Sequence, residues 1–180
     1  MKLTKLLLLI FILPITFIVI YIVVRFIGVQ GFLFAFNLNF ILMTGVGGFI
    51  QILKGKNTSN YFNHKPLEQK GKIYKFIGIN FFRKLLVWIG WEKLNKKSNP
   101  IEKNIKSLKH LHYQTKQSEL AHLIILIIVL FFNFLVAFKF GILKSLWLLV
   151  LNILLNFYPI LLQRYNRPRI ERIINLSKQR

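Results

Sequence analysis

Four long apolar blocks constrain the fold of this chain more than any other feature of its sequence. The blocks cover about residues 6–27, 32–53, 119–138 and 143–162. Each is close to the roughly 20 apolar residues that an α-helix needs to cross the hydrocarbon core of a bilayer. Hydrophobic residues make up 54% of the 180 residues, more than a soluble domain of this size can hide from water. The sequence therefore predicts an all-α membrane protein with four transmembrane helices.

The N-terminal segment, residues 1–53, contains the first two spans. Lysines precede the first block, as in a signal peptide, but the block is much longer than a signal-peptide core and no small-residue cleavage site follows it. We therefore interpret it as a retained span. The second block carries Asn37, Asn39 and the small-residue tract 44–48. We interpret these as helix-packing features, because glycines let helices approach closely in lipid and asparagines bond between them.

The connection between the second and third spans, residues 54–118, is strongly basic. Within it, residues 73–94 mix aromatic and aliphatic side chains with lysine and arginine. This stretch is too apolar for an ordinary surface helix and too charged to span, so we expect an interfacial helix in the head-group region. Asn99 and Pro100 then form a helix-start signal. We expect a helix from about residue 100 that continues into the third span.

The third and fourth spans form a transmembrane hairpin over residues 119–162, followed by a basic tail, residues 163–180. Two antiparallel spans return the chain to the side it left, so the polar clusters at 114–122 and 163–169 should meet at one membrane face. Counting 1.5 Å per residue places Asn133 and Asn152 at similar depth. We expect these two asparagines to bond across the hairpin, and the tail to lie along the membrane surface.

The distribution of positive charge predicts the topology. Residues 54–116 carry 15 lysines and arginines and the tail from Arg164 carries six, whereas the two opposite loops hold only Arg25, Lys139 and Lys144. Loops rich in lysine and arginine stay in the cytoplasm. We therefore expect an inner (cytoplasmic) membrane protein with both termini and the interfacial segment in the cytoplasm. The basic residues that give the net charge of +21 would then lie next to anionic lipid head groups. Because this position explains the charge, we expect no nucleic-acid partner.

Few side chains are available for chemistry. The chain has no cysteine and no aspartate, and only five glutamates. It therefore lacks a thiolate nucleophile, and it also lacks the Gly-x-Ser-x-Gly elbow of serine hydrolases. Glu119 and His122 supply two metal ligands, and His112 is ten residues away, so the sequence indicates a metal site only weakly and we assign no metal ligands.

Glu119 and His122 lie three residues apart where a helix enters the membrane, and they are neighbours on its surface. A carboxylate beside an imidazole orients the ring and raises its basicity, which suits a histidine that takes a proton from an alcohol. Simple capping and anchoring of the helix explains the spacing equally well. Arg164, Arg167 and Arg169 leave a similar choice between positive-inside anchors and a two-point grip on a phosphate.

Two motifs resemble those of the glycosyl-4,4'-diaponeurosporenoate acyltransferase family. The first motif reads Thr115-Lys116-Gln117-Ser118-Glu119-Leu120-Ala121-His122, and the second reads Gln163-Arg164-Tyr165-Asn166-Arg167-Pro168-Arg169. Glu68, Gly71 and Tyr74 are similar to a further stretch in the cytoplasmic segment of the family. Members are small bacterial membrane proteins, and the namesake esterifies the glucose of a carotenoid glycoside with a fatty acyl chain.

The resemblance implies a membrane acyltransferase with His122 as general base and Glu119 as its orienting partner. It implies a substrate-binding set on the polar clusters: Glu68, Lys116, Arg164, Tyr165, Asn166, Arg167 and Arg169. Membrane lipids, an amphiphilic glycosylated acceptor and an acyl donor such as acyl-CoA or acyl-carrier protein would be the partners. No cofactor is expected, and the sequence indicates no oligomeric state. The alternative is a non-catalytic membrane adaptor or lipid-binding protein. A transporter is a weaker reading, because no charged residue lies near the middle of any span.

Overall fold

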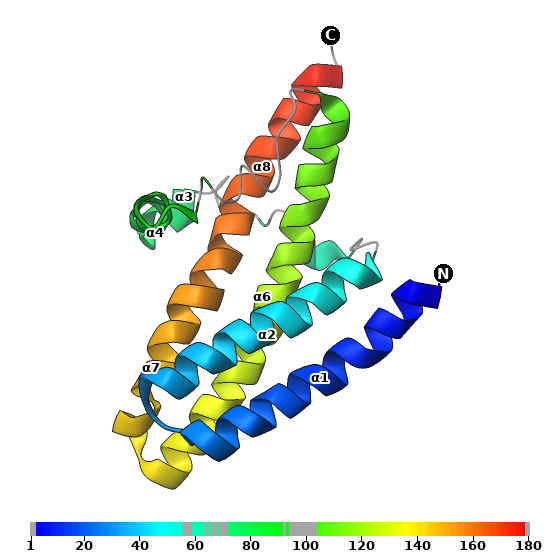
Figure 1. Ribbon diagram of the computed structural model, residues 1–180. Helices are drawn as coiled ribbons and strands as arrows, with labels where there is room; N and C mark the ends of the chain where they lie inside the picture. Colours follow the sequence, from blue (N-terminus) through cyan, green and yellow to red (C-terminus); the bar gives the residue numbers. More distant parts are fainter. Residues whose placement is uncertain are drawn as a thin grey trace. The chain divides into compact units, whose positions relative to one another are not determined.

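The computed structural model describes residues 3–55, 59–63, 65, 68, 72–91, 93 and 104–178. All regular secondary structure in this described part is helical (Figure 1). The long helices, in chain order, are α1 (Leu3–Ile27), α2 (Gly31–Leu53), α6 (Ile105–Phe140), α7 (Ile142–Asn152) and α8 (Tyr158–Lys178). The short elements are the 3₁₀ turn η1 (Asn60–Phe62), α3 (Lys72–Phe76), α4 (Ile79–Trp88) and the π-helical turn η3 (Ile153–Phe157).

Four helical stretches are long and apolar enough to cross a membrane. They are Leu3–Ile27, Gly31–Leu53, Ile105–Phe140 and Ile142–Ser177, the last of which joins α7, η3 and α8. The predicted all-α architecture with four membrane-crossing helices is thus confirmed. The cytoplasmic position of the segment between the second and third stretches stays a prediction.

The chain divides into two compact units, which are described separately. The first unit consists of Met1–Lys56 and Gln117–Pro159, and the second consists of Asn57–Lys116 and Ile160–Arg180. The first contains α1, α2, most of α6, and α7 with η3. The second contains α3, α4, the first turns of α6, and most of α8.

In the first unit, α1 and α2 form an antiparallel hairpin (Figure 1). The small-residue tract on α2 lets the two helices approach closely, because a Cβ at Gly45 would meet the side chain of Thr16. The other face of α2 carries Phe34 and Leu38, which are buried in one core with Val129 and Leu148 of the second hairpin. Many large apolar side chains of α1 are exposed, which is typical of a surface that faces lipid.

The second hairpin, α6 to α7, is closed by Gly141, whose φ of +90° favours glycine at this turn. Asn133 and Asn152 do bond across it, but each donates to a backbone carbonyl. Asn133 Nδ2 donates to the Ser145 oxygen at 2.8 Å, and Asn152 Nδ2 donates to the Leu126 oxygen at 3.0 Å. The expectation of a bond between the two asparagines is therefore wrong, because each side-chain amide bonds to a carbonyl of the facing helix instead.

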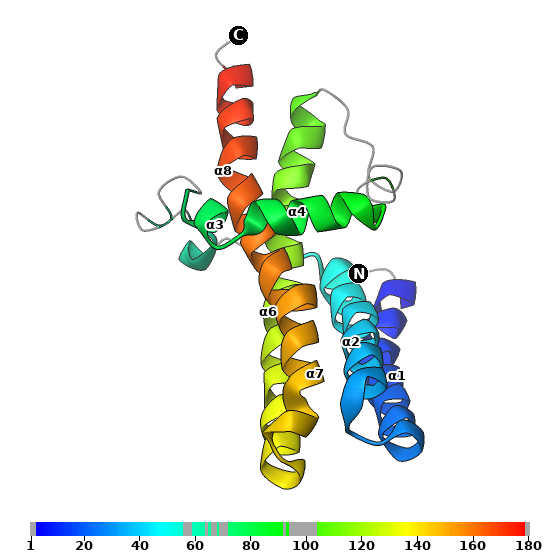
Figure 2. The same ribbon diagram turned by 90° about the vertical axis from the view of Figure 1, so that its left-hand side faces the viewer.

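In the second unit, the stretch that we expected as one interfacial helix is divided into α3 and α4, which lie across α8 (Figure 2). Gly78 separates the two helices, and its φ of +89° favours glycine and ends the first helix. Helix α6 starts after Asn104, whose side-chain oxygen accepts a hydrogen bond from the Ser107 N–H at 2.7 Å. The start that we expected near residue 100 lies outside the described residues.

Candidate active site

His122 and Asn156 form the central contact of the first unit. The His122 Nδ1 atom lies 3.2 Å from Asn156 Oδ1. Asn156 is fully buried and sits in η3, the π-helical turn between α7 and α8. Single π-turns inserted in α-helices occur frequently at functional sites.

The Asn156 amide is held by two further asparagines. Its Nδ2 atom donates to Asn39 Oδ1 at 2.7 Å and to Asn152 Oδ1 at 2.8 Å. The orientation of those two side chains is fixed in turn, because each donates its own amide hydrogens to a carbonyl. Asn39 donates to the Ala35 oxygen at 2.8 Å and Asn152 to the Leu126 oxygen. Buried amides with this many partners are strongly oriented.

This chain of hydrogen bonds indicates which nitrogen of His122 faces an acceptor and so carries the proton. Asn39 and Asn152 present oxygens to Asn156, so the nitrogen of Asn156 must face them and its oxygen must face His122. An oxygen only accepts, so His122 Nδ1 must donate. In the neutral ring, Nε2 then bears the lone pair. The asparagine network therefore leaves Nε2 as the basic nitrogen of His122.

Glu119 precedes His122 by three residues on α6 and its side chain is fully buried. A carboxylate in such a place is costly unless it has partners or a role. The ring contacts that the structure gives His122 are with the Asn156 side chain and the Leu155 backbone. The orienting role of Glu119 at that ring stays a prediction.

Arg164 of the second motif is held by protein groups of the second unit. Its Nη1 atom lies 2.6 Å from Glu68 Oε1, and its Nη2 donates to the Tyr61 carbonyl at 3.3 Å. Tyr74 is buried and bonds the same carboxylate. Burial and the Glu68 carboxylate raise the pKa of Tyr74 to about 12. Two separate family-like stretches, one with Glu68 and Tyr74 and one with Arg164, thus meet in a single buried cluster.

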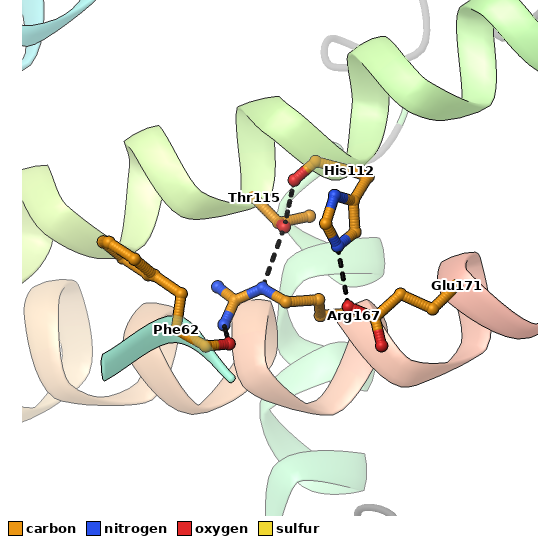
Figure 3. Close-up of polar contacts among 5 residues, drawn as sticks. All are labelled: Phe62, His112, Thr115, Arg167 and Glu171. Atoms are coloured by element: carbon orange, nitrogen blue, oxygen red, sulfur yellow. Dashed lines mark hydrogen bonds and ion pairs between the residues drawn. The ribbon is translucent and has the colours of Figure 1, made fainter. Parts of the chain in front are cut away.

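Arg167 is likewise buried and engaged (Figure 3). Its Nη1 donates to the Phe62 carbonyl at 2.9 Å, and its Nε donates to Thr115 Oγ1 at 3.3 Å. Beside it, His112 Nε2 lies 2.8 Å from Glu171 Oε1. These bonds tie α6, α8 and η1 together, which is a structural use of Arg167.

The remaining residues of the predicted substrate-binding set lie in two places. One is next to the buried Arg167 cluster, and the other is an open groove. Lys116 Nζ lies 5.8 Å from the centre of the Phe62 ring, next to Arg167. Tyr165 is buried, and the Arg169 guanidinium lies 3.6 Å from the centre of its ring. Asn166 and Arg169 line the groove, together with residues of α4.

The two predicted halves of the site fall in different compact units, Glu119 and His122 in the first and the arginines in the second. Among the residues that the structure describes, no three histidine, cysteine, aspartate or glutamate side chains are placed to hold a metal ion. Sequence reasoning missed Asn156 as the partner of His122 and Arg83 of α4 as a groove residue. Asn156 lies one helical turn after Asn152 in an apolar span, and this isolated polar pair was the one available signal.

The family comparison decides the class of the protein. The model of the glycosyl-4,4'-diaponeurosporenoate acyltransferase family matches residues 58–176. The chain belongs to this family. No curated protein and no solved structure matches the chain. The family description is that of an acyltransferase of carotenoid biosynthesis, and the four apolar helices agree with a membrane-embedded member. The matched region includes η1, the groove and His122.

Proposed function

We propose that the protein transfers a fatty acyl chain to a hydroxyl of a carotenoid glycoside or a similar glycosylated amphiphile, with His122 as the general base. Family membership supplies acyl transfer as the reaction class. The hydrogen bond between His122 Nδ1 and Asn156 Oδ1 carries the choice of base. It supports a neutral ring whose Nε2 atom accepts a proton.

In the proposed reaction, His122 Nε2 takes the proton from the hydroxyl group of the glycosylated substrate. The oxygen of that hydroxyl attacks the carbonyl carbon of an acyl thioester at the same time. A carbon–oxygen bond forms and the carbon–sulfur bond breaks. The proton on Nε2 then passes to the departing thiolate, so the histidine returns to its starting state. General-base assistance of this kind contributes about 10²–10⁴-fold to the rate. Glu119 would support the ring during the transient positive charge.

Arg164 and Arg167 bond to groups of the protein, so we assign them a structural role instead of substrate binding. Arg164 and Arg167 would hold η1 and the Glu68 stretch in place, because their bonds run to Glu68, Tyr61, Phe62 and Thr115. Arg169 remains for substrate, since its side chain is exposed and lines the groove. Tyr165 and Asn166 would support it there.

The apolar spans support substrates that stay in the bilayer. Both the acceptor and the acyl chain have long apolar parts, so a site built on membrane-crossing helices spares them transfer through water. We infer from the lysine and arginine distribution that both termini and the donor-binding face are cytoplasmic. Membrane lipids would then surround the four spans, and no bound cofactor enters the reaction.

The test compares the lipids and pigments of cells that carry the wild-type protein, His122→Ala or Glu119→Gln. Mass spectrometry should find the acylated glycoside with the wild type, and at least a 100-fold lower yield with His122→Ala. His112→Ala is the matched control, because that ring pairs with Glu171 in the other unit, and it should retain product. Unchanged profiles for both test variants, with equal amounts of protein in the membrane, would favour a lipid-binding adaptor instead. The strongly exposed Phe76 and Trp88 would suit such an adaptor.

A further inference from the structure

The second unit contains an open groove of about 1010 Å³. Its walls come from α4, α6 and α8, so it lies within one compact unit. Pockets for small ligands range over about 300–1,000 Å³. This groove is therefore at the upper end of that range and can hold an extended amphiphile.

The groove is lined by two chemically different kinds of residue. Val87, Trp88 and Ile173 are apolar, whereas Arg83, Lys84 and Arg169 carry positive charge. On α4 and on α8 each of these apolar residues follows one of the cations by one helical turn. No acidic residue is among the described residues that line the groove. A ligand that complements this lining has an apolar chain and an anionic group.

Arg83 and Arg169 converge on one buried aromatic ring. The Arg169 guanidinium lies 3.6 Å and the Arg83 guanidinium 5.8 Å from the centre of the Tyr165 ring. Cations are attracted to the face of an aromatic ring, but two like charges held near each other repel. An anion between them would remove this repulsion and could accept hydrogen bonds from both planar groups.

The described glutamates of the chain are committed elsewhere. Glu68 pairs with Arg164, Glu171 pairs with His112, and Glu119 belongs to the other unit. None of these three described glutamates lines the groove, so a bound anion would complement its charge. Several cations and several apolar residues in one groove match an acyl chain joined to a carrier with several phosphate groups.

We propose that the groove between α4 and α8 binds an acyl-coenzyme A thioester, with Arg83 and Arg169 on its phosphates and Val87, Trp88 and Ile173 along its acyl chain. This inference rests on the proposed function, because it names the donor of that reaction and where the donor binds. Lys84 adds a third cation, which favours coenzyme A, with its several phosphates, over the single phosphodiester of a carrier-protein arm.

The test measures equilibrium binding of palmitoyl-coenzyme A to the full chain in phosphatidylcholine nanodiscs, without acceptor. Palmitoyl-pantetheine, which lacks the phosphates, is the second probe. The test variant is Arg83→Gln with Arg169→Gln. The matched control is Lys109→Gln with Arg172→Gln, which removes the same charge from exposed residues that do not line the groove. Arg83→Lys with Arg169→Lys keeps the charge and loses the planar fork.

We expect the wild type to bind palmitoyl-coenzyme A at least about tenfold more tightly than palmitoyl-pantetheine. The double glutamine variant should lose that difference, the double lysine variant should lose part of it, and the control should keep it. His122→Gln should bind as the wild type does, so a loss of activity in that variant concerns the base and not the groove. Equal binding of the two probes, or an equal loss in the control, would overturn the proposal. It would also fail if phosphatidylglycerol displaced the probe from the wild type at similar concentration, since the groove would then be a lipid head-group site.

Discussion

Asn156→Leu removes the side-chain hydrogen bond that orients His122 while it keeps a side chain of similar size. Three bonds are lost, of 2.7, 2.8 and 3.2 Å. Two of them run to other helices, to Asn39 and His122, whereas the bond to Asn152 lies within one helical stretch. Side-chain hydrogen bonds between membrane helices contribute about 0.6 kcal/mol each on average, so the variant should lose about 1 kcal/mol of stability from these two. That loss leaves a folded protein to assay.

The effect on turnover should be larger than this loss of stability explains. Without the Asn156 oxygen at Nδ1, the neutral ring loses the side-chain acceptor that favours a proton on that nitrogen, and the positive ring that forms during reaction loses a partner. A hydrogen bond to a charged group is worth about 1.5–3 kcal/mol. We therefore expect kcat to fall by about 10–100-fold, with KM nearly unchanged because Asn156 does not bind substrate in the proposed reaction.

The assay follows acyl transfer by purified protein in nanodiscs, with rates corrected for the folded fraction. Asn37→Leu is the control. Asn37 and Asn39 both donate to a carbonyl of their own helix, but it is Asn39 whose side-chain oxygen accepts the hydrogen bond from Asn156. It should lose little activity. A corrected kcat for Asn156→Leu within about twofold of the wild type would refute the argument that the asparagine network sets the reactive nitrogen.

Three further predictions test the scaffold. Gly45→Ala should destabilise the α1–α2 hairpin by about 1–3 kcal/mol, because its new Cβ would meet Thr16, whereas Gly47→Ala, with open space around it, should not; thermal unfolding in detergent compares the two, and equal melting temperatures would contradict the packing. Arg164→Ala should lower the free energy of unfolding by about 3–5 kcal/mol, because it leaves Glu68 buried without its cation. A double-mutant cycle with Glu68→Gln measures the coupling energy between the two residues, and a coupling energy of zero would contradict the pairing. Tyr74 has a pKa raised to about 12, so its contribution is complete below pH 10 and is lost as pH rises from 10 to 12, by about 2 kcal/mol; Tyr74→Phe should show a flatter stability profile in that window, and an identical slope would contradict the assignment.

Hydrophobic periodicity and composition were sufficient to predict the four-helix architecture, because each membrane span is a long run of apolar residues that is easy to recognise in the sequence. A stretch such as residues 119–138 has few ways to satisfy its backbone in lipid other than a helix. The continuous α6 followed from the same reasoning. The division of residues 73–94 at Gly78 was harder to predict, since one glycine in an amphipathic pattern is compatible with either a continuous helix or a break.

The candidate site was predicted only in part, for a physical reason. Helical spacing gives neighbours on one helix, so it pointed to Glu119 as the partner of His122. The Asn156 contact depends on a π-turn, which adds a residue to the helix and rotates Asn156 relative to the regular pattern. Similarly, the sequence could count the arginines of 163–169 but could not tell which of them the fold would bury against Glu68 and Phe62.

The most direct test of the account is the protonation state of His122 itself. Nitrogen NMR of protein labelled with ¹⁵N-histidine, in nanodiscs at neutral pH, distinguishes protonated from unprotonated ring nitrogens, and His122→Gln identifies the signals among the four histidines. We expect a neutral His122 ring with its proton on Nδ1 and an unprotonated Nε2, a pattern that Asn156→Leu should abolish. A proton on Nε2 with none on Nδ1, or a doubly protonated ring, would contradict the claim that His122 Nε2 is the base.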